Sequence, residues 1–545
     1  MEKIPSSGPQ WRVLQNKQTR FAKDPYGRHR QQARLESGRT RRSQICNPYM
    51  QEPLEKYRGR KGSRSYIHIQ PQRSTELQPY NQLELTTQSG NDSDFKTLLL
   101  KMVVQPLNAV AGFLCSIKSL QPSLDTELND SRIQAELQSL YSQKRMEVES
   151  AVKDASNLVL SAELWSSNEA MFYLTVSCHL ITENWRQKSY VLDTAHLLNE
   201  HTPEYVQKQL LRISNEWSIT ENIQVVVTNV DGMKKVPHGY QWAYLPCFAN
   251  TLNKMFKETI DYSDWKHLLR KCQRIVAFFH QNNKASESLR NYCFHINLKL
   301  TELTQITDLK WLPTLHMLKS ILELWPAIFN VFATSRVDDL CLNENERKTL
   351  NDIVAVLNLL KKVTENIGNQ EYSPISNIIP LVQNLQKELR NLVMMGNRIA
   401  QILSQKCDYH IGSIKKNNWF RVSTALDPQY KTCLLNDSGV EDVKTEIRSK
   451  MRENTHTVQS RYDFKSEEMI LQKYWQINIS ENPLKFWSTN VEFKQLAPVA
   501  RKYLTVVSTA IPMECVHQFE KSQIINRRSN LEPKNLSMIL FLNAN

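Results

Sequence analysis

Two apolar, strand-like runs in the middle of the chain both end in a polar side chain. The run NLVLSAELWSS reaches Glu163, and about 66 residues later the run IQVVVTNVDGM reaches Asn229. A third polar residue of interest, Glu514, lies near the C-terminus. Carboxylates from two strand ends and one distant segment form a layout that holds two divalent metal ions, which activate an attacking oxygen and stabilise a leaving one.

This layout is that of an RNase H-like polynucleotidyl transferase, but here one charge is missing. Three carboxylates would supply three negative charges, whereas Glu163, Asn229 and Glu514 supply two. Mg²⁺ requires near-octahedral oxygen ligands at about 2.1 Å. A glutamate places its oxygens roughly 1.5 Å farther from the backbone than an aspartate, and an error of about 1 Å can cost around a hundredfold in rate. We therefore expect no nuclease or transposase activity, no bound metal and no other cofactor, and we expect that replacing Asn229 and Glu163 by Asp restores divalent-ion binding.

Ten short motifs, in the same order as in a known family, extend from about residue 95 to residue 545. They are QPLNAVAGF (105–113), the strand ending at Glu163, HTPEYVQKQL from His201, VVVTNVDGM, PCFANTLN (246–253), KWLPTLHML (310–318), ALDPQYK (425–431), PLKFW (483–487), ARKYL (500–504) and the terminal NRRSNLEPKNLSMILFLNAN. In this region the chain resembles an hAT-superfamily transposase of the kind domesticated in zinc-finger BED domain-containing proteins.

The departures from that family fall on its catalytic motifs. The resemblance implies Asp where this chain has Glu163 and Asn229, and His where it has Asn250. The Ser-Glu-Arg expected around the third acid reads Met513, Glu514 and Cys515. Together these changes favour a catalytically inactive, domesticated protein.

The ten cysteines are scattered and form no CxxC pair. Family members often carry a BED finger before the transposase body, but Cys46 is the single cysteine before Cys115, so we expect no BED finger and no disulfide framework. Scattered thiols suit a reducing, nuclear or cytosolic compartment. Because no apolar run approaches eighteen residues and the N-terminus lacks a hydrophobic core segment, we expect neither a membrane protein nor a secretory leader.

Positive charge is concentrated at the N-terminus. Residues 1–80 contain 17 Lys and Arg against 6 Asp and Glu, a net charge of +11, whereas residues 81–545 contain 52 against 49, a net charge of +3. The basic clusters comprise Arg39, Arg41, Arg42, Arg58, Arg60, Lys61 and Arg64. So basic a segment with few aliphatic residues is predicted to be disordered. It is either a nuclear-import and phosphate-binding arm, which would bind DNA largely without sequence specificity, or a solvated leader without a partner.

Hydrophobic periodicity predicts the remaining organisation. We expect strands at 157–166, 171–182, 188–197 and 223–229 and a helix at 203–217, followed by about two hundred helical residues. Apolar stripes at Leu350–Leu360 and Ile378–Leu389, the first preceded by an Asn343-x-x-Glu346 capping box, support these helices. The expected fold is α/β: an RNase H-like transposase core interrupted by a large all-helical insertion, with a disordered basic tail. The expected boundaries are 1–90 tail, 91–150 helical segment, 151–260 first part of the core, 261–480 insertion, and 481–545 C-terminal dimerisation region completing the core.

The C-terminal region carries the dimerisation that the resemblance implies. Candidate contacts are Phe486, Trp487, Leu496, Leu540 and Phe541, although such residues equally suit the core of a single subunit. The favoured function is a nuclear, homodimeric, DNA-associated or transcription-regulating protein. The alternative is a protein-interaction scaffold that never contacts DNA.

Overall fold

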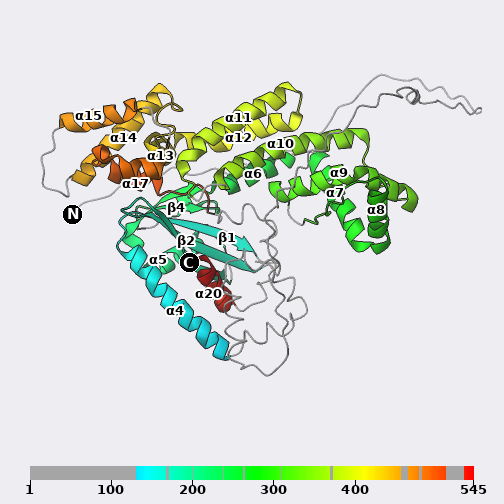
Figure 1. Ribbon diagram of the computed structural model, residues 1–545, viewed down its shortest axis with the longest axis horizontal. Helices are drawn as coiled ribbons and strands as arrows, with labels where there is room; N and C mark the ends of the chain where they lie inside the picture. The colour runs from blue at the N-terminus through cyan, green and yellow to red at the C-terminus, as the bar shows by residue number, and fades with distance from the viewer. Residues whose placement is uncertain are drawn as a thin grey trace, which may run out of the picture. The chain divides into compact units, whose positions relative to one another are not determined.

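The computed structural model describes residues 131–166, 171–198, 201–236, 239–261, 264–306, 309–368, 372–455, 464–477, 481–510 and 533–545. Within them a mixed five-stranded sheet is surrounded by helices (Figure 1). The expected mixed α/β class is confirmed. The basic clusters of residues 39–64 and Glu514 lie outside the described residues.

The sheet has the order β3-β2-β1-β4-β5. Its strands are β1 (Leu158–Ser166), β2 (Phe172–Ile181), β3 (Gln187–Leu197), β4 (Ile223–Thr228) and β5 (Ala243–Pro246). The first three strands form an antiparallel meander, whereas β4 runs parallel to β1, and β5 runs parallel to β4. Four strands and the intervening helix α5 (Pro203–Glu216) match the sequence-based expectation. The short strand β5 was not predicted.

One face of the sheet is covered by helices from both ends of the described chain. These are α4 (Ser131–Lys153), α5 and the C-terminal α20 (Pro533–Ala544) (Figure 1). Leu160 and Val176 from the sheet share a buried cluster with Val152, Leu210 and Phe541 from the three helices. Segments some 400 residues apart in the sequence therefore build one core.

The other core joins the sheet to a long helical block. Val159 of β1 and Val225 and Val227 of β4 belong to a buried cluster that continues through the helices from α6 to α12 and reaches Phe420. These helices are α6 (Phe248–Ile260), α7 (Asp264–Gln281), α8 (Asn283–His295), α9 (Trp311–Ser335), α10 (Glu344–Gly368), α11 (Ile378–Met394) and α12 (Arg398–Lys416). Because α6 and α7 share this cluster, hydrophobic packing is continuous across residue 261.

The start of α10 shows the predicted capping box. Glu346 N–H donates to Asn343 Oδ1 at 2.8 Å, and Asn343 N–H donates to Glu346 Oε2 at 2.8 Å. Glu346 also accepts from Lys271 Nζ of α7 at 2.9 Å, which ties the helix start to its neighbour. Leu350, which begins the predicted apolar stripe, is fully buried.

A third cluster gathers the helices that follow the block. It contains α13 (Asn418–Leu426), α14 (Asp437–Thr455), α15 (Phe464–Gln476), α16 (Pro483–Thr489) and α17 (Ala497–Leu504), together with Ile181 and Trp185 from the β2–β3 hairpin. Asp427, which follows α13 and is fully buried, accepts from Ser376 Oγ at 2.7 Å and from Gln429 N–H at 3.0 Å. Burial raises the pKa of this carboxyl to about 6.

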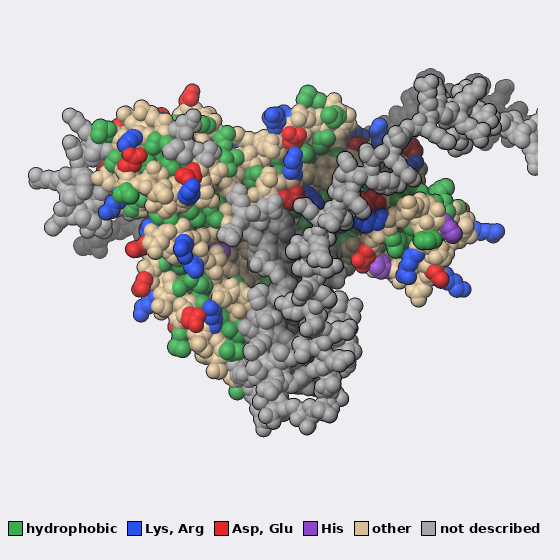
Figure 2. Space-filling model, in the orientation of Figure 1, with side chains coloured by type: hydrophobic (Ala, Val, Ile, Leu, Met, Phe, Trp, Pro, Cys, Tyr) green, Lys and Arg blue, Asp and Glu red, His purple; other side chains and the backbone are tan. Residues whose placement is uncertain are grey.

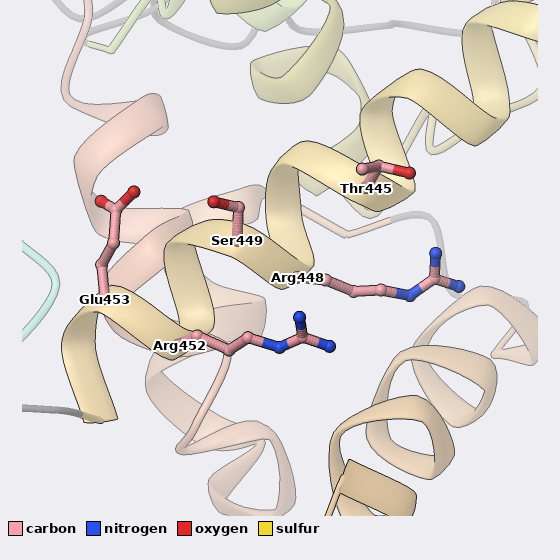
Figure 3. A pocket seen from close by; sticks show the side chains of 5 residues that line it. All are labelled: Thr445, Arg448, Ser449, Arg452 and Glu453. Atoms are coloured by element: carbon pink, nitrogen blue, oxygen red, sulfur yellow. The ribbon is translucent and has the colours of Figure 1, made fainter.

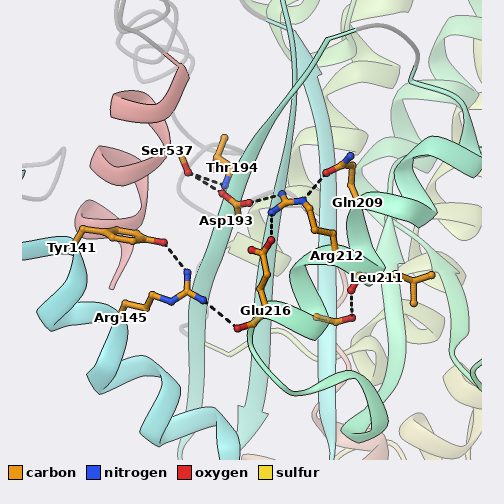
Figure 4. A network of polar contacts seen from close by, with 10 residues as sticks. Tyr141, Arg145, Asp193, Thr194, Gln209, Leu211, Arg212, Glu216 and Ser537 are labelled. Atoms are coloured by element: carbon orange, nitrogen blue, oxygen red, sulfur yellow. Dashed lines mark hydrogen bonds and ion pairs between the residues drawn. The ribbon is translucent and has the colours of Figure 1, made fainter. Parts of the chain in front are cut away.

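The C-terminal helix α20 closes the free edge of β3. Asn545 Oδ1 accepts from Val191 N–H at 3.0 Å, and its Nδ2 donates to Val191 O at 2.8 Å. Thr194 N–H donates to Ser537 Oγ at 3.3 Å, and Ser537 Oγ in turn donates to Asp193 Oδ1 at 2.9 Å (Figure 4). Edge strands left open invite pairing with other chains, so these side chains replace a missing neighbouring strand.

No helix in the described part of the chain is both long enough and apolar enough to span a lipid bilayer.

Candidate functional site

The fold brings two of the three predicted metal-binding positions together. Strands β1 and β4 are parallel neighbours, and Ala162 is the register partner of Thr228. Glu163 and Asn229, which follow these two residues, therefore lie at the same edge of the sheet. The third position, Glu514, is outside the described residues. Ala510, the last residue described before it, donates its N–H to Cys247 Sγ at 3.3 Å just beyond β5.

Asn229 is joined to β1 through both ends of its side-chain amide. Leu164 N–H donates to Asn229 Oδ1 at 2.8 Å, and Asn229 Nδ2 donates to Leu164 O at 2.8 Å. A primary amide presents a donor and an acceptor side by side, as a peptide group does. The side chain thus extends the β1–β4 ladder one step beyond the last backbone pair, and we call this arrangement the amide clasp.

The amide clasp changes what an aspartate at this position would do. An ionised carboxylate only accepts hydrogen bonds, so it could keep the bond from Leu164 N–H but would set an oxygen against the Leu164 carbonyl. Asn229 therefore does more than replace a charged side chain by a neutral one, because its Nδ2 makes a hydrogen bond to β1. The expectation that aspartates at positions 163 and 229 restore divalent-ion binding stays a prediction, and the second substitution would also remove a hydrogen bond within the sheet.

Asn250, where the resemblance implies a histidine, contacts the same segment. It lies in the first turn of α6, and its Nδ2 donates to Asn229 O at 3.2 Å. Two of the departures noted in the sequence are thus adjacent in space. Both contribute neutral amides where the resemblance implies groups that titrate or bind metal.

Glu163 lies in β1 with its side chain half-buried. Loss of hydration raises its pKa to about 7, while the positive charge of Lys310 works in the opposite direction. Lys310 immediately precedes α9. The nearby acid Asp231 is ion-paired with Lys254 of α6. Lysines therefore accompany both acids here, a pattern that the sequence did not reveal because Lys310 and Lys254 are remote from them along the chain.

The described residues contain no cluster of three His, Cys, Asp or Glu side chains that could hold a metal ion. Cys178 and His179, adjacent in β2, point to opposite faces of the sheet. Cys178 is buried in the core, whereas the His179 ring contacts Ser161 Oγ at 2.9 Å and Ser189 Oγ at 2.8 Å. Burial lowers the pKa of His179 to about 4.

The candidate dimerisation residues lie mostly inside the chain. Phe486, Trp487 and Leu496 are buried in the α13–α17 cluster, Phe541 is buried against the sheet, and Leu540 is half-buried. Trp487 Nε1 also donates to Leu426 O at 3.0 Å. For the four buried side chains this placement favours the alternative of a core role.

Two segments of the chain match known domain families. Residues 161–236 match the family described as the ZBED1 RNase-like domain, and residues 463–545 match the hAT family C-terminal dimerisation region. The first segment starts within β1, contains Glu163 and Asn229 and ends before β5. The second starts before α15, so it includes a helix that the sequence analysis had placed in the insertion.

Curated relatives are similar to the chain over about two thirds of its length. Human zinc finger BED domain-containing protein 4 is 22% identical over 401 residues, which cover 69% of this chain and 34% of that protein. The putative AC transposase of Zea mays is 20% identical over 395 residues, covering 66% and 46%. Human zinc finger BED domain-containing protein 6 is 19% identical over 394 residues, covering 64% and 39%. The matched region thus spans between about a third and just under half of each relative.

Proposed function

We propose that this chain, which is homologous to zinc finger BED domain-containing proteins and to an hAT transposase, is a transposase-derived protein that self-associates and does not cut or join DNA. We further propose that it acts in the nucleus as a DNA-associated or transcription-regulating factor on an RNase H-like core. The observation that carries the proposal is the amide clasp. A side chain that is committed through both polar atoms to the β1 backbone is poorly placed to coordinate a divalent ion.

Charge supports the same conclusion. Of the three expected metal-binding positions only Glu163 and Glu514 carry a carboxylate, and the raised pKa of Glu163 leaves that group only partly ionised near neutral pH. Two Mg²⁺ ions bring four positive charges, and taking ions from water requires strong compensation by ligands. The lysines beside Glu163 and Asp231 add further repulsion for a cation.

Self-association is supported by the hAT dimerisation region at residues 463–545. DNA association rests on the +11 charge of residues 1–80, since clustered Lys and Arg bind phosphates without reading sequence. The proposal of nuclear localisation rests on the same basic clusters.

A protein-interaction scaffold without DNA contact is the second candidate. The observation in its favour is the near-neutral charge of residues 81–545, +3 from 52 basic and 49 acidic residues. On the face drawn in Figure 2, basic and acidic side chains are interspersed. A surface of that kind is poorly suited to neutralising a run of phosphates.

One experiment tests catalytic silence. The purified chain is incubated with duplex and nicked DNA ends in Mg²⁺ or Mn²⁺, and cleavage and strand transfer are followed by gel electrophoresis. We expect no product. Metal-dependent cleavage by the unmodified chain that is lost in Glu514→Ala would overturn the proposal, because it would show that two carboxylates and an amide suffice.

A second experiment separates the two candidate functions. Chromatin occupancy of the full chain is compared with that of residues 81–545, which lack the basic tail. Discrete sites retained without the tail support a DNA-associated role for the body. Absence of occupancy by both proteins would leave the scaffold as the better reading.

A further inference from the structure

A groove of about 670 Å³ lies between the start of strands β4 and β5 and the helices α13, α14 and α17. Ile223 and Ala243, the first residues of the two strands, line it. Asn229 follows the opposite end of β4, and a six-residue strand spans roughly 20 Å. The groove is therefore separate from the degenerate site, and its volume lies within the ~300–1,000 Å³ range of small-molecule sites.

The sheet side of the groove presents a fixed aromatic surface. The rings of Tyr240 and Trp242 are stacked, with centroids 5.5 Å apart and planes 21° apart. Trp242 is buried, and its Nε1 donates to Thr220 O at 3.1 Å, which holds the pair in place. Tyr240 is half-buried, and a Cβ placed on the adjacent Gly239 would meet no atom within 4 Å. Tyr240 and Gly239 both line the groove, so the exposed part of the Tyr240 side chain is open to a group that enters it.

The helical side presents two ammonium groups. Lys450 pairs with Glu453 at 2.7 Å. Lys502, from α17, has no hydrogen bond or ion pair among the described residues, and its Nζ lies 5.9 Å from the centroid of the Trp419 ring. Burial, and then the charge of Lys450, lower the pKa of Lys502. The charges of Glu453 and Glu446 raise that pKa by smaller amounts. A partly desolvated ammonium without a direct ion pair is stabilised by an anion that enters the groove.

Two carboxylates, those of Glu221 and Glu446, also line the groove. Glu446 Oε1 accepts from Tyr503 OH at 3.2 Å. A second hollow on α14, of about 310 Å³, provides a contrast. There Arg448 and Arg452 extend side by side (Figure 3), but Arg448 is paired with Glu468 at 2.8 Å and Arg452 with Glu467 at 3.4 Å. The arginines are already neutralised by α15, whereas Lys502 is not.

We propose that this groove binds a nucleotide, with the base stacked on Tyr240 and the phosphate held by Lys502 and Lys450. Aromatic stacking and a nearby cation are the combination by which proteins hold single nucleotides or single strands without reading sequence. The ligand is either a free nucleotide or the phosphorylated end of a single strand. This inference is independent of the proposed loss of catalysis.

The test is a binding titration of the full chain, followed by tryptophan fluorescence and calorimetry. The probes are thymidine 5′-monophosphate, 5′-phosphorylated tetrathymidylate and thymidine. We expect saturable binding of a phosphorylated probe and at least about tenfold weaker binding of thymidine. Lys502→Gln and Tyr240→Leu should each weaken binding of the phosphorylated probe by about tenfold or more, the range found for lost stacking or phosphate contacts.

Lys494→Gln is the matched control, because Lys494 is exposed and does not line the groove. It carries the same charge change and should alter affinity less than twofold. Equal affinity for the monophosphate and the tetranucleotide identifies a free nucleotide as the ligand. Much tighter binding of the tetranucleotide, if it is still weakened by Lys502→Gln, identifies the end of a strand. Thermal melting shows which variants are folded. No saturation by either phosphorylated probe, or undiminished binding by a folded Lys502→Gln or Tyr240→Leu variant, would overturn the proposal.

Discussion

Replacing Asn229 by Asp should destabilise the sheet in a pH-dependent way. The substitution keeps the size of the side chain but removes the Nδ2 donor, so the hydrogen bond of 2.8 Å to Leu164 O is lost. The new carboxylate oxygen would then face that carbonyl. The other bond, from Leu164 N–H at 2.8 Å, would remain and become charge-assisted.

The two effects differ in magnitude. A lost neutral hydrogen bond costs about 1 kcal/mol net, and a carbonyl left without a partner costs a further 1–3 kcal/mol or so. Strengthening of the retained bond offsets about 1 kcal/mol. The ionised variant should therefore be less stable than the wild type by about 1–3 kcal/mol, a large fraction of a total stability of order 5–15 kcal/mol.

The cost disappears when the new carboxyl is protonated, because its O–H can then donate to Leu164 O. At about 1.4 kcal/mol per pH unit, the expected penalty raises the folded-state pKa of the new carboxyl by roughly one to two units above its unfolded value of about 4. An acid with a raised folded-state pKa contributes stability at low pH that is lost as the pH rises. The variant should therefore match the wild type near pH 4 and fall progressively below it between about pH 4 and 6.

The assay is urea denaturation at equilibrium, at intervals from pH 4 to pH 8, with fluorescence and circular dichroism as probes. The matched control is Asn283→Asp, which makes the same charge change at an exposed residue at the start of α8 that is not part of a clasp. Asn545→Asp, which disturbs the equivalent amide pair on Val191 of β3, should repeat the pH-dependent loss more weakly at the sheet edge. If Asn229→Asp is as stable as the wild type at pH 7.5 without added metal, the structural role of the clasp is refuted.

Four further outcomes are expected. Glu163→Gln should stabilise the protein above pH 7 by up to about 2–3 kcal/mol, because the wild-type carboxyl, whose pKa is raised to about 7, makes stability fall between pH 4.5 and 7. Denaturation curves that shift equally at pH 4.5 and pH 8 would contradict this. The wild type should lose stability as the pH falls from 6.5 to 4, because the lowered pKa of His179 disfavours the folded state as the ring becomes protonated, and His179→Gln should lose less. An equal decrease of the melting temperature in both proteins over this pH range would argue against it. Light scattering of the full chain at micromolar concentration should give a dimer or larger species, and a monomer would count against self-association. DNA retention should fall steeply with salt and should fall again when residues 1–80 are removed, and equal retention by the two proteins at low salt would exclude the tail as a binding arm.

The sequence predicted the elements whose patterns are local. β1 to β4 and the α10 and α11 stripes follow from apolar periodicity, and the capping box at Asn343 follows from a four-residue pattern. β5 escaped because AYLP is too short to show alternation, and its strand conformation depends on pairing with β4. Local patterns cannot report such tertiary pairing.

The candidate site was predictable in its chemistry but not in its contacts. The missing charge at Asn229 can be read from the residue itself, whereas the bidentate contact with Leu164 requires the β1–β4 register. Apolar side chains such as Trp487 look the same in a subunit core and in an interface, so sequence alone left those alternatives open. The groove joins residues 240 and 502, whose separation along the chain hides any pattern.

The attachment of α20 to β3 limits what truncation can reveal about oligomerisation. A fragment ending before Pro533 would lose the Asn545 and Ser537 contacts and leave the backbone groups of Val191 and Thr194 open to strands from other molecules. It would also uncover the apolar pocket that Phe541 fills. Such a fragment is expected to aggregate edge to edge through its sheets. High-molecular-weight species formed by shortened versions would therefore report an exposed strand, and the native interface is better mapped with surface substitutions in the intact chain.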